Sequence, residues 1–210
     1  MVLSIPHRGF AIILSSPSAA GKSSLAKALL QIDQNLQLSI SATTREPRPN
    51  EINGVNYYFK TPNEFDKSIK SGELLEYAHI YGNYYGTPKT PIITLLNQDK
   101  DILFDIDYQG MLAIKQVLKN IVTIFILPPS IHTLKQRIQD RGQDNSEVMA
   151  SRLKLADAEI EYARHYDYIV INDQFEIALN TIHSIIIAQR ASRIRLNLDT
   201  LLAQLKNPIN

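Results

Sequence analysis

Residues 10–23 read Phe-Ala-Ile-Ile-Leu-Ser-Ser-Pro-Ser-Ala-Ala-Gly-Lys-Ser, and this stretch decides the fold. The apolar run from Phe10 to Leu14 predicts a short buried strand. The residues from Ser23 to Gln31 favour a helix with one apolar face. A strand, a glycine-bearing loop and a helix in this order are typical of the start of an α/β fold with a parallel sheet.

The loop between this strand and this helix carries the signature of a phosphate site. Gly21-Lys22-Ser23 matches the end of the P-loop pattern, although Ser16 stands where the first glycine is usual. In such a loop the backbone N–H groups cradle a β-phosphate, the lysine reaches the β- and γ-phosphates, and the hydroxyl binds Mg²⁺. The alternative is a serine-rich turn with a chance Gly-Lys-Ser, and the flanking strand and helix argue against it. Alone, the loop predicts a nucleotide phosphate site but no particular reaction.

The rest of the chain shows two kinds of sequence pattern. The outer parts alternate strands and helices, which predicts a parallel sheet flanked by helices. The middle, about residues 41–97, has short strands, many tyrosines and many turns, and we interpret it as an insertion. In the outer parts we expect strands at Leu36–Ser41, Asp101–Asp107, Asn120–Leu127 and Tyr168–Asn172, and helices at Gly110–Lys119, Ser130–Arg141, Ser146–His165 and Glu176–Arg195, with Leu196–Leu205 as a candidate extension. In the middle we expect strands at Val55–Phe59 and Leu74–Ile80, helices at Pro62–Lys70 and Pro88–Asn97, and a turn at Asn83–Pro88.

Asp105 and Asp107 form a second element of the phosphate site. In a strand these two residues share a face, and buried carboxylates are costly unless they meet a cation or hydrogen-bond donors. We therefore expect Asp105 to lie near Mg²⁺ or Lys22. An isolated pair of this kind would indicate only an acid that caps the end of a strand. Beside a P-loop, the metal site is the better interpretation.

Composition and charge exclude several classes of protein. The 210 residues are 44% hydrophobic and 20% charged with a formal net charge of +1, which fits one compact domain and indicates no nucleic-acid or membrane partner. The absence of cysteine excludes a disulfide framework. Because we find no signal-peptide pattern and no apolar run near the roughly 20 residues of a membrane span, we expect a cytoplasmic protein. The sequence leaves the choice between a monomer and a homo-oligomer undecided, and five histidines show no metal-ligand spacing: His7, His79, His132, His165 and His183.

Four motifs in the middle segment narrow the function. They are Ser-Ala-Thr-Thr-Arg-Glu-Pro-Arg at 41–48, Asn-Gly-Val-Asn-Tyr at 53–57, Gly-Glu-Leu-Leu-Glu at 72–76 and Gly-Asn-Tyr-Tyr-Gly-Thr at 82–87. With them, the sequence resembles the guanylate kinase family from about Arg8 to Ile187. The resemblance implies a P-loop nucleoside monophosphate kinase with Mg²⁺ as cofactor and ATP as co-substrate, which phosphorylates GMP, and dGMP, in purine nucleotide metabolism and releases ADP. It also implies a CORE (1–40, 98–128 and 166–210), a small mixed α/β GMP-binding insertion (41–97) and a helical LID (129–165).

The resemblance further implies roles for individual residues. Catalysis is expected of Lys22, Arg45, Arg141 and Arg152. Metal binding is expected of Ser23 and Asp105. ATP binding is expected of Ser16, Pro17, Ser18, Ala19, Ala20, Gly21, Lys22, Ser23, Ser24, Arg137 and Asn172. GMP binding is expected of Ser41, Arg45, Arg48, Tyr57, Glu76, Tyr85, Thr87 and Asp107.

The chemistry of these residues supports several of the roles independently. Guanine presents adjacent N1–H and N2–H₂ donors, which adenine lacks, and one carboxylate such as that of Glu76 can accept both. Arg45 and Arg48 lie in an extended, proline-containing stretch that favours fork contacts to a phosphate. Arg137 and Arg141 are four residues apart and share one helix face. Because the acceptor is a phosphate oxygen that is already ionised, no general base is needed.

Plainer interpretations exist for each residue taken alone. The arginines of the insertion can be solvated loop charges, those of the LID can pair with Asp140 or Glu147, and the tyrosines can pack the insertion, as we expect of Tyr84. Two functional alternatives are a catalytically inactive guanylate-kinase-like binding module and a kinase for another nucleotide, which Glu76 and Ser41 argue against.

Two residues depart from the family pattern, and the tail lies outside the likeness. Ala19 stands where the family usually has glycine, and we expect it to adopt a positive φ. Thr87 replaces a frequent serine and keeps the hydroxyl. Beyond Arg195 the chain is expected to form a helix that packs on the core or makes a dimer contact.

Overall fold

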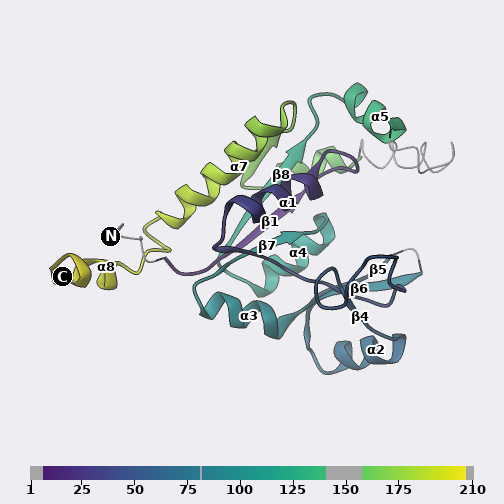
Figure 1. Ribbon diagram of the computed structural model, residues 1–210, viewed down its shortest axis with the longest axis horizontal. Helices are drawn as coiled ribbons and strands as arrows, with labels where there is room; N and C mark the ends of the chain where they lie inside the picture. The colour runs from purple at the N-terminus through teal and green to yellow at the C-terminus, as the bar shows by residue number, and fades with distance from the viewer. Residues whose placement is uncertain (1–6, 81, 141–157, 207–210) are drawn as a thin grey trace.

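The computed structural model describes residues 7–80, 82–140 and 158–206, which build two β-sheets with helices around the larger one (Figure 1). The larger sheet has five strands in the order β2-β7-β1-β8-β9, and every neighbouring pair is parallel. The predicted parallel sheet is confirmed. Its strands are β1 (Ala11–Ser15), β2 (Leu36–Leu38), β7 (Asp101–Asp105), β8 (Ile121–Leu127) and β9 (Tyr168–Ile171).

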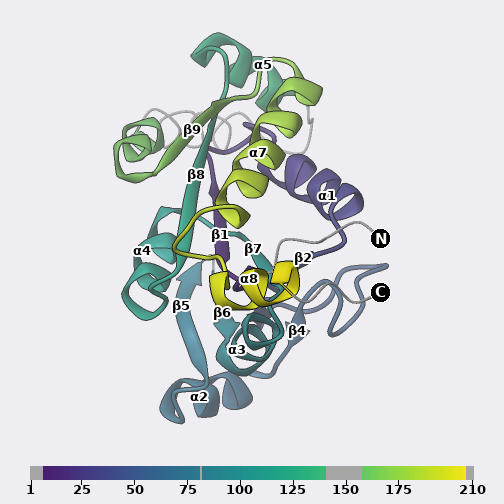
Figure 2. The same ribbon diagram turned by 90° about the vertical axis from the view of Figure 1, so that its left-hand side faces the viewer.

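Helices cover both faces of this sheet, as the two views in Figures 1 and 2 show. On one face Ile12 and Leu14 of β1 pack with apolar residues of α1 (Lys22–Ile32) and α7 (Phe175–Arg190). On the other face Ala11 and Ile13 pack with α3 (Lys89–Asn97) and α4 (Tyr108–Val117). Because successive side chains of a strand point to opposite faces, a continuous apolar run is what a strand between two helical layers requires.

The smaller sheet lies within residues 41–97 and is mixed. Its order is β4-β3-β6-β5, with β3 and β4 parallel and the other pairs antiparallel. The helix α2 (Pro62–Lys70) begins with a capping box in which Thr61 and Glu64 bond to each other's backbone N–H. The strands are β3 (Ala42–Thr43), β4 (Tyr58–Phe59), β5 (Leu74–Ile80) and β6 (Asn83–Pro88).

Three sequence predictions need correction, two in the smaller sheet and one in the larger sheet. Residues 83–88 form strand β6, not a turn, because they pair with β5 along almost its whole length. The glycine that suggested a turn, Gly86, instead allows close packing, since a Cβ there would lie 2.8 Å from the Glu76 carbonyl oxygen. The strand predicted at Leu36–Ser41 ends at Leu38, and the one predicted at Val55–Phe59 shrinks to its last two residues because residues 52–56 form a turn.

Two further elements end earlier than predicted. The strand predicted to reach Asp107 ends at Asp105, and Asp107 instead caps α4 by accepting from the Gly110 N–H at 2.9 Å. The last long helix ends at Arg190, and the tail forms a separate helix, α8 (Leu198–Lys206), of which no residue is buried. The helix α5 (Ile131–Asp140) agrees with the prediction. The predicted helix at Ser146–His165 lies partly outside the described residues, and its last part is a 3₁₀ turn, η1 (Glu161–His165).

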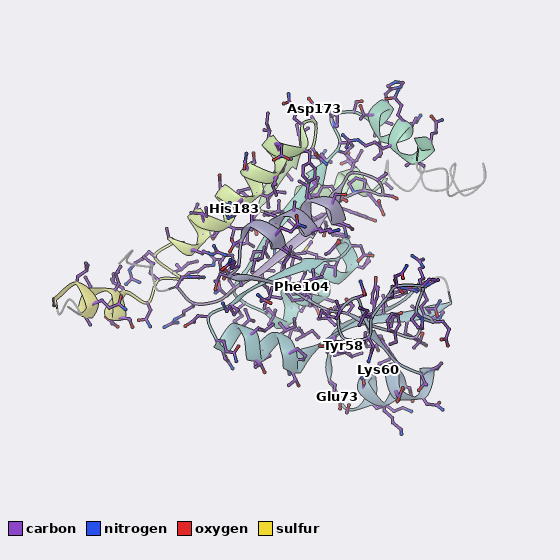
Figure 3. All side chains as sticks on the ribbon, in the orientation of Figure 1. Tyr58, Lys60, Glu73, Phe104, Asp173 and His183 are labelled. Atoms are coloured by element: carbon purple, nitrogen blue, oxygen red, sulfur yellow. The ribbon has the colours of Figure 1, made fainter. Side chains whose placement is uncertain are left out.

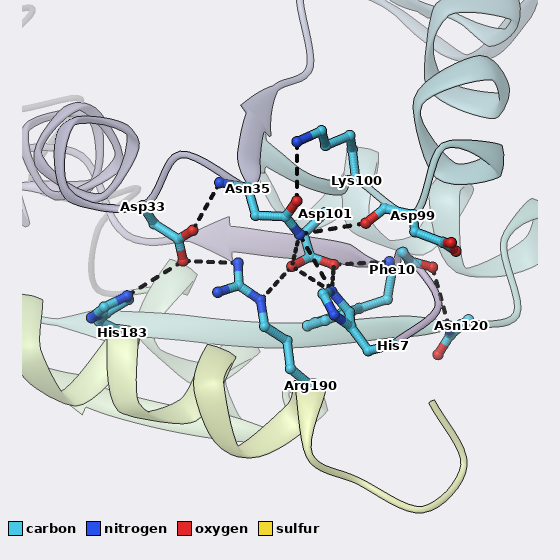
Figure 4. A network of polar contacts seen from close by, with 11 residues as sticks. His7, Phe10, Asp33, Asn35, Asp99, Lys100, Asp101, Asn120, His183 and Arg190 are labelled. Atoms are coloured by element: carbon cyan, nitrogen blue, oxygen red, sulfur yellow. Dashed lines mark hydrogen bonds and ion pairs between the residues drawn. The ribbon is translucent and has the colours of Figure 1, made fainter. Parts of the chain in front are cut away.

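A buried polar network closes the end of the larger sheet where its strands begin (Figure 4). Arg190 at the end of α7 lies between two carboxylates: its Nε donates to Asp101 at 2.7 Å, and its Nη2 is 2.8 Å from Asp33. Asp101 is fully buried and Asp33 is 6% exposed. His7 lies 3.1 Å from Asp101, and His183 lies 3.3 Å from Asp33. The network therefore links α7 to the ends of α1 and β7.

Candidate active site

The loop between β1 and α1 has an unusual backbone conformation, because Ala19 and Gly21 both adopt a positive φ. Ala19 has a φ of 64°, which confirms the conformation expected for this departure from glycine. Gly21 has a φ of 96° and precedes α1. A Cβ on Gly21 would lie 2.3 Å from the side-chain nitrogen of Asn172, so that only glycine fits. The same Asn172 nitrogen donates to the Ala20 carbonyl at 2.8 Å, which fixes the second half of the loop.

Lys22, Ser23 and Asp105 meet at the carboxyl edge of the sheet. The Lys22 ammonium forms an ion pair with one oxygen of Asp105, and the Ser23 hydroxyl donates to the other at 2.8 Å. Because β1 and β7 are parallel neighbours, their carboxyl ends and the residues that follow lie at one edge. The structure thus brings together the lysine, hydroxyl and acid that the sequence assigned to one phosphate and metal site.

The Ser23 and Asp105 oxygens are the kind of ligands that Mg²⁺ takes when substrate phosphates and water supply the rest of its shell. Across the described ranges of the chain, no group of three or more histidine, cysteine or acidic side chains is arranged to hold a metal ion. A hydroxyl and one carboxylate suit a metal shared with a nucleotide better than a metal held by protein alone.

A cavity of about 210 Å³ lies beside this edge and joins it to the smaller sheet. Lys22 and Asp105 form its phosphate-loop side. Five residues that the sequence analysis assigned to GMP binding also line the cavity: Ser41, Tyr57, Glu76, Tyr85 and Asp107. Thr87 contributes through Glu76, whereas Arg45 and Arg48 lie outside the lining, and Arg48 is exposed. A second substrate placed here would lie within reach of the phosphate loop.

Glu76 and Thr87 are partners across β5 and β6. They are paired in the sheet register, and the Thr87 hydroxyl donates to Glu76 Oε1 at 2.7 Å. Burial raises the pKa of the Glu76 carboxyl above its ordinary value, the Thr87 hydroxyl opposes this, and the charge of Asp107 adds to it. The threonine hydroxyl therefore orients a carboxylate that faces the cavity.

Arg45 is held by a carboxylate that the sequence analysis did not single out. Its Nη2 donates to both oxygens of Glu51, at 2.8 and 2.9 Å, and the Arg48 backbone N–H donates to the same carboxylate at 2.8 Å. The hydrogen bond from Arg45 lowers the pKa of Glu51. The guanidinium also lies 5.4 Å from the ring centre of Tyr57. The sequence did contain a signal for this contact, namely an acid three residues after Arg48. A short loop can bring such an acid back beside the two arginines.

A second cavity, of about 330 Å³, lies on the outer side of the phosphate loop. It gathers predicted ATP-binding residues from three distant parts of the sequence: Ala19, Gly21, Ser24, Arg137 and Asn172. The Arg137 Nη2 donates to the Asn172 carbonyl at 3.0 Å. Sequence reasoning missed Asp173 and Phe175, which also line it. The two cavities have no lining residue in common, and Gly21 of the loop lines this one whereas Lys22 lines the other. Figure 3 shows Asp173, which lines this cavity, well away from Tyr58 of the smaller sheet.

A comparison of the sequence with known protein families agrees with this arrangement, in which one phosphate loop contributes to two cavities. Residues 8–189 match the model of the guanylate kinase family. The chain belongs to the guanylate kinase family. It is 57% identical over 187 residues to the guanylate kinase of Rickettsia bellii, covering 89% of this chain and 98% of the relative. It is 44% identical over 190 residues to that of Hyphomonas neptunium, covering 90% of this chain and 88% of the relative.

A solved structure gives the same result. The crystal structure of guanylate kinase from Anaplasma phagocytophilum superposes with a TM-score of 0.75 at 30% identity, covering 98% of this chain and 99% of that chain. Two arginines that the guanylate kinase resemblance assigned to the LID, Arg141 and Arg152, lie outside the described residues. The remaining predicted site residues are all described, and the loop residues Ser16, Pro17, Ser18 and Ala20 lie between β1 and α1 as expected.

Proposed function

We propose that this chain transfers the terminal phosphoryl group of Mg-ATP to GMP, and to dGMP, forming ADP and the nucleoside diphosphate. Membership of the guanylate kinase family supports ATP-dependent phosphorylation of GMP to GDP, and the inactive binding module is not supported. The observation that carries the proposal is the cavity of about 210 Å³, which we call the acceptor-side cavity. In it, Lys22 and Asp105 at the edge of the phosphate loop face Glu76 and Ser41.

The proposed mechanism is positioning and charge neutralisation. The carboxylate of Glu76, oriented by Thr87, accepts the paired donors of guanine, while Tyr57 in the lining and Arg45 beside the Tyr57 ring hold the acceptor phosphate. Lys22 neutralises charge on the transferring phosphoryl group. Mg²⁺, when bound by Ser23 and Asp105 with the ATP phosphates, supplies further neutralisation and fixes the geometry of the phosphates. Because the acceptor oxygen is already ionised, no side chain has to remove a proton.

Several finer points belong to the same proposal. The segment 41–97 binds GMP, the segment 129–165 acts as the LID, and the rest forms the CORE. Arg137 and Asn172 line the adenine side of the ATP site, and Arg48, Arg141 and Arg152 contact phosphates. A cytoplasmic location, and the lack of nucleic-acid and membrane partners, stay predictions from the sequence. No described helix is long and apolar enough to cross a membrane.

A panel of acceptors tests the function directly. The purified protein, supplied with ATP and Mg²⁺, is expected to turn over GMP and dGMP with a kcat/KM at least about 100-fold above those for AMP, CMP and UMP, since a site built for hydrogen bonds rejects a base that lacks them. A coupled assay for ADP measures this. Equal or faster turnover of AMP, CMP or UMP would show that the base assignment is wrong.

Glu76→Gln is expected to raise the KM for GMP about 5- to 150-fold, which corresponds to about 1–3 kcal/mol, because it presents an amide donor to guanine's donors. In the wild type, the KM for GMP should also rise as the pH falls through the raised pKa of Glu76, since only the ionised carboxylate accepts both donors. The variant should lose this pH dependence, and the KM for ATP should stay near wild type. Glu73→Gln, on an exposed side chain nearby, is the matched control. An unchanged KM for GMP in the Glu76 variant would remove Glu76 from base recognition.

A further inference from the structure

A short segment that follows residue 157 contacts both sides of the active site. The Ser18 backbone N–H in the phosphate loop donates to Glu159 Oε2 at 3.3 Å, across 141 residues of sequence. Three residues later, the Tyr162 ring stacks on that of Tyr108, with ring centres 4.0 Å apart and planes at 7°. Tyr108 is the first residue of α4 and follows Asp107, which lines the acceptor-side cavity. This segment thus forms a hydrogen bond to the phosphate loop and packs beside the acceptor-side cavity.

The contact at Ser18 lies next to the strained position of the loop. Ser18 precedes Ala19, whose φ of 64° places a Cβ-bearing residue in the left-handed region, at a cost of about 1–2 kcal/mol. Such a conformation persists only where the surroundings hold the neighbouring peptides. Asn172 holds the Ala20–Gly21 peptide through the Ala20 carbonyl, and Glu159 holds the Pro17–Ser18 peptide through the Ser18 N–H. The two side chains therefore fix the chain at the residue before Ala19 and at the residue after it, which limits the conformations open to Ala19.

The chemistry of Glu159 indicates that its oxygen, more than its charge, performs this task. The side chain is half-buried, and burial raises its pKa, as does the nearby charge of Asp107, while the Ser18 N–H and the charge of Lys22 lower it. A backbone N–H needs only an acceptor oxygen, which a carboxylate, a carboxylic acid and an amide all provide. A glutamine should therefore replace Glu159, whereas an alanine should not.

We propose that Glu159 is a positioning residue for the phosphate loop, whose side-chain oxygen holds the Ser18 peptide so that Ala19 keeps the conformation that receives the phosphates of ATP. This inference rests on the proposed ATP:GMP phosphotransfer. It assigns to the segment after residue 157 a direct part in shaping the ATP site. It also gives the alanine at position 19 a compensating contact that lies outside the loop.

Three variants test the proposal: Glu159→Ala, Glu159→Gln and the control Glu161→Ala, whose exposed carboxylate pairs with Arg164 away from the loop. Glu159→Ala is expected to raise the KM for ATP about three- to tenfold, the range of one lost hydrogen bond, with the KM for GMP within about twofold of wild type. Glu159→Gln and Glu161→Ala should behave as wild type. A wild-type KM for ATP in Glu159→Ala, or an equal loss in Glu159→Gln, would overturn the proposal. Equal rises in both KM values with a lower Tm would do so too, because they indicate general damage.

Calorimetric titration of ATP into each variant separates this inference from the function itself, because it needs no turnover. If the wild type failed to phosphorylate GMP, the proposed function would fail, and the calorimetric Kd values would still decide the role of Glu159. The Ala19→Gly background provides a second measurement. Glycine removes the strain, so the effect of Glu159→Ala on ATP affinity should shrink there. An undiminished effect would overturn the link between Glu159 and Ala19.

Discussion

Lys22→Ala is expected to lower kcat about 10²- to 10³-fold, the largest effect that we predict for a single substitution on activity. Removal of one preorganised charge or donor from a developing phosphoryl transition state costs about 2.7–4 kcal/mol. Lys22 is the cation that the structure places between the phosphate loop and the acceptor-side cavity, paired with Asp105. Because this charge matters most as the phosphoryl group transfers, the KM for GMP should change far less than kcat.

The measurement is steady-state kinetics with both substrates varied, together with a thermal melt that confirms folding. Lys27→Ala is the matched control, because Lys27 lies on the same helix with an exposed side chain. It should retain wild-type kinetics. A Lys22 variant that changed only the KM for GMP would contradict a role in the transfer step.

Arg190→Ala is expected to lower the free energy of unfolding by about 3–5 kcal/mol, the largest effect that we predict on stability. The variant leaves the carboxylates of Asp33 and Asp101, one 6% exposed and the other fully buried, without their shared cation. His7 and His183 compensate only to the extent that they are protonated. Activity per folded molecule should persist, since the network closes the end of the sheet opposite to the phosphate loop.

Urea denaturation followed by circular dichroism measures this loss. Arg193→Ala, an exposed arginine three residues later, serves as control and should change the free energy of unfolding by less than about 0.5 kcal/mol. A loss below about 1 kcal/mol for Arg190→Ala would show that water or rearranged side chains replace the ion pairs. A large loss of kcat in molecules shown to be folded would contradict the separation between this network and the active site.

The parts of the fold that were predictable are those that local pattern determines. The strand before the phosphate loop, the helix after it and the placement of Lys22 beside Asp105 follow from a short apolar run, a glycine loop and the geometry of parallel neighbours. Residues 83–88 were interpreted wrongly because glycine, asparagine and proline are turn formers in isolation. Their pairing with β5, and the close approach at Gly86, are tertiary effects that no local pattern contains.

Long-range contacts explain the other differences. The last long helix ends at Arg190 and not at the predicted Arg195, because the chain turns back and buries Arg195 over the Phe10 ring, with 4.6 Å between guanidinium and ring centre. Glu51 and Glu159 escaped notice for a related reason. Each is an ordinary acid in the sequence, and only the folded chain shows that one holds Arg45 and the other holds the Ser18 peptide.

The way in which the smaller sheet joins the larger one has a consequence for how such enzymes can be rebuilt. Residues 41–97 leave the larger sheet after β2 and return at β7, and these two strands are hydrogen-bonded neighbours, with Leu36 opposite Asp101. Because the two strands are parallel, the segment leaves at the carboxyl edge of the sheet and returns at its amino edge, and a replacement that spans the same crossover can be exchanged as a cassette without rethreading the parent sheet. A grafted replacement would have to supply the packing of Leu75 and Ile92, which are buried with β1 and α4 in one cluster. Under that condition, a single phosphate-loop platform could accept interchangeable recognition units, each bringing its own choice of acceptor.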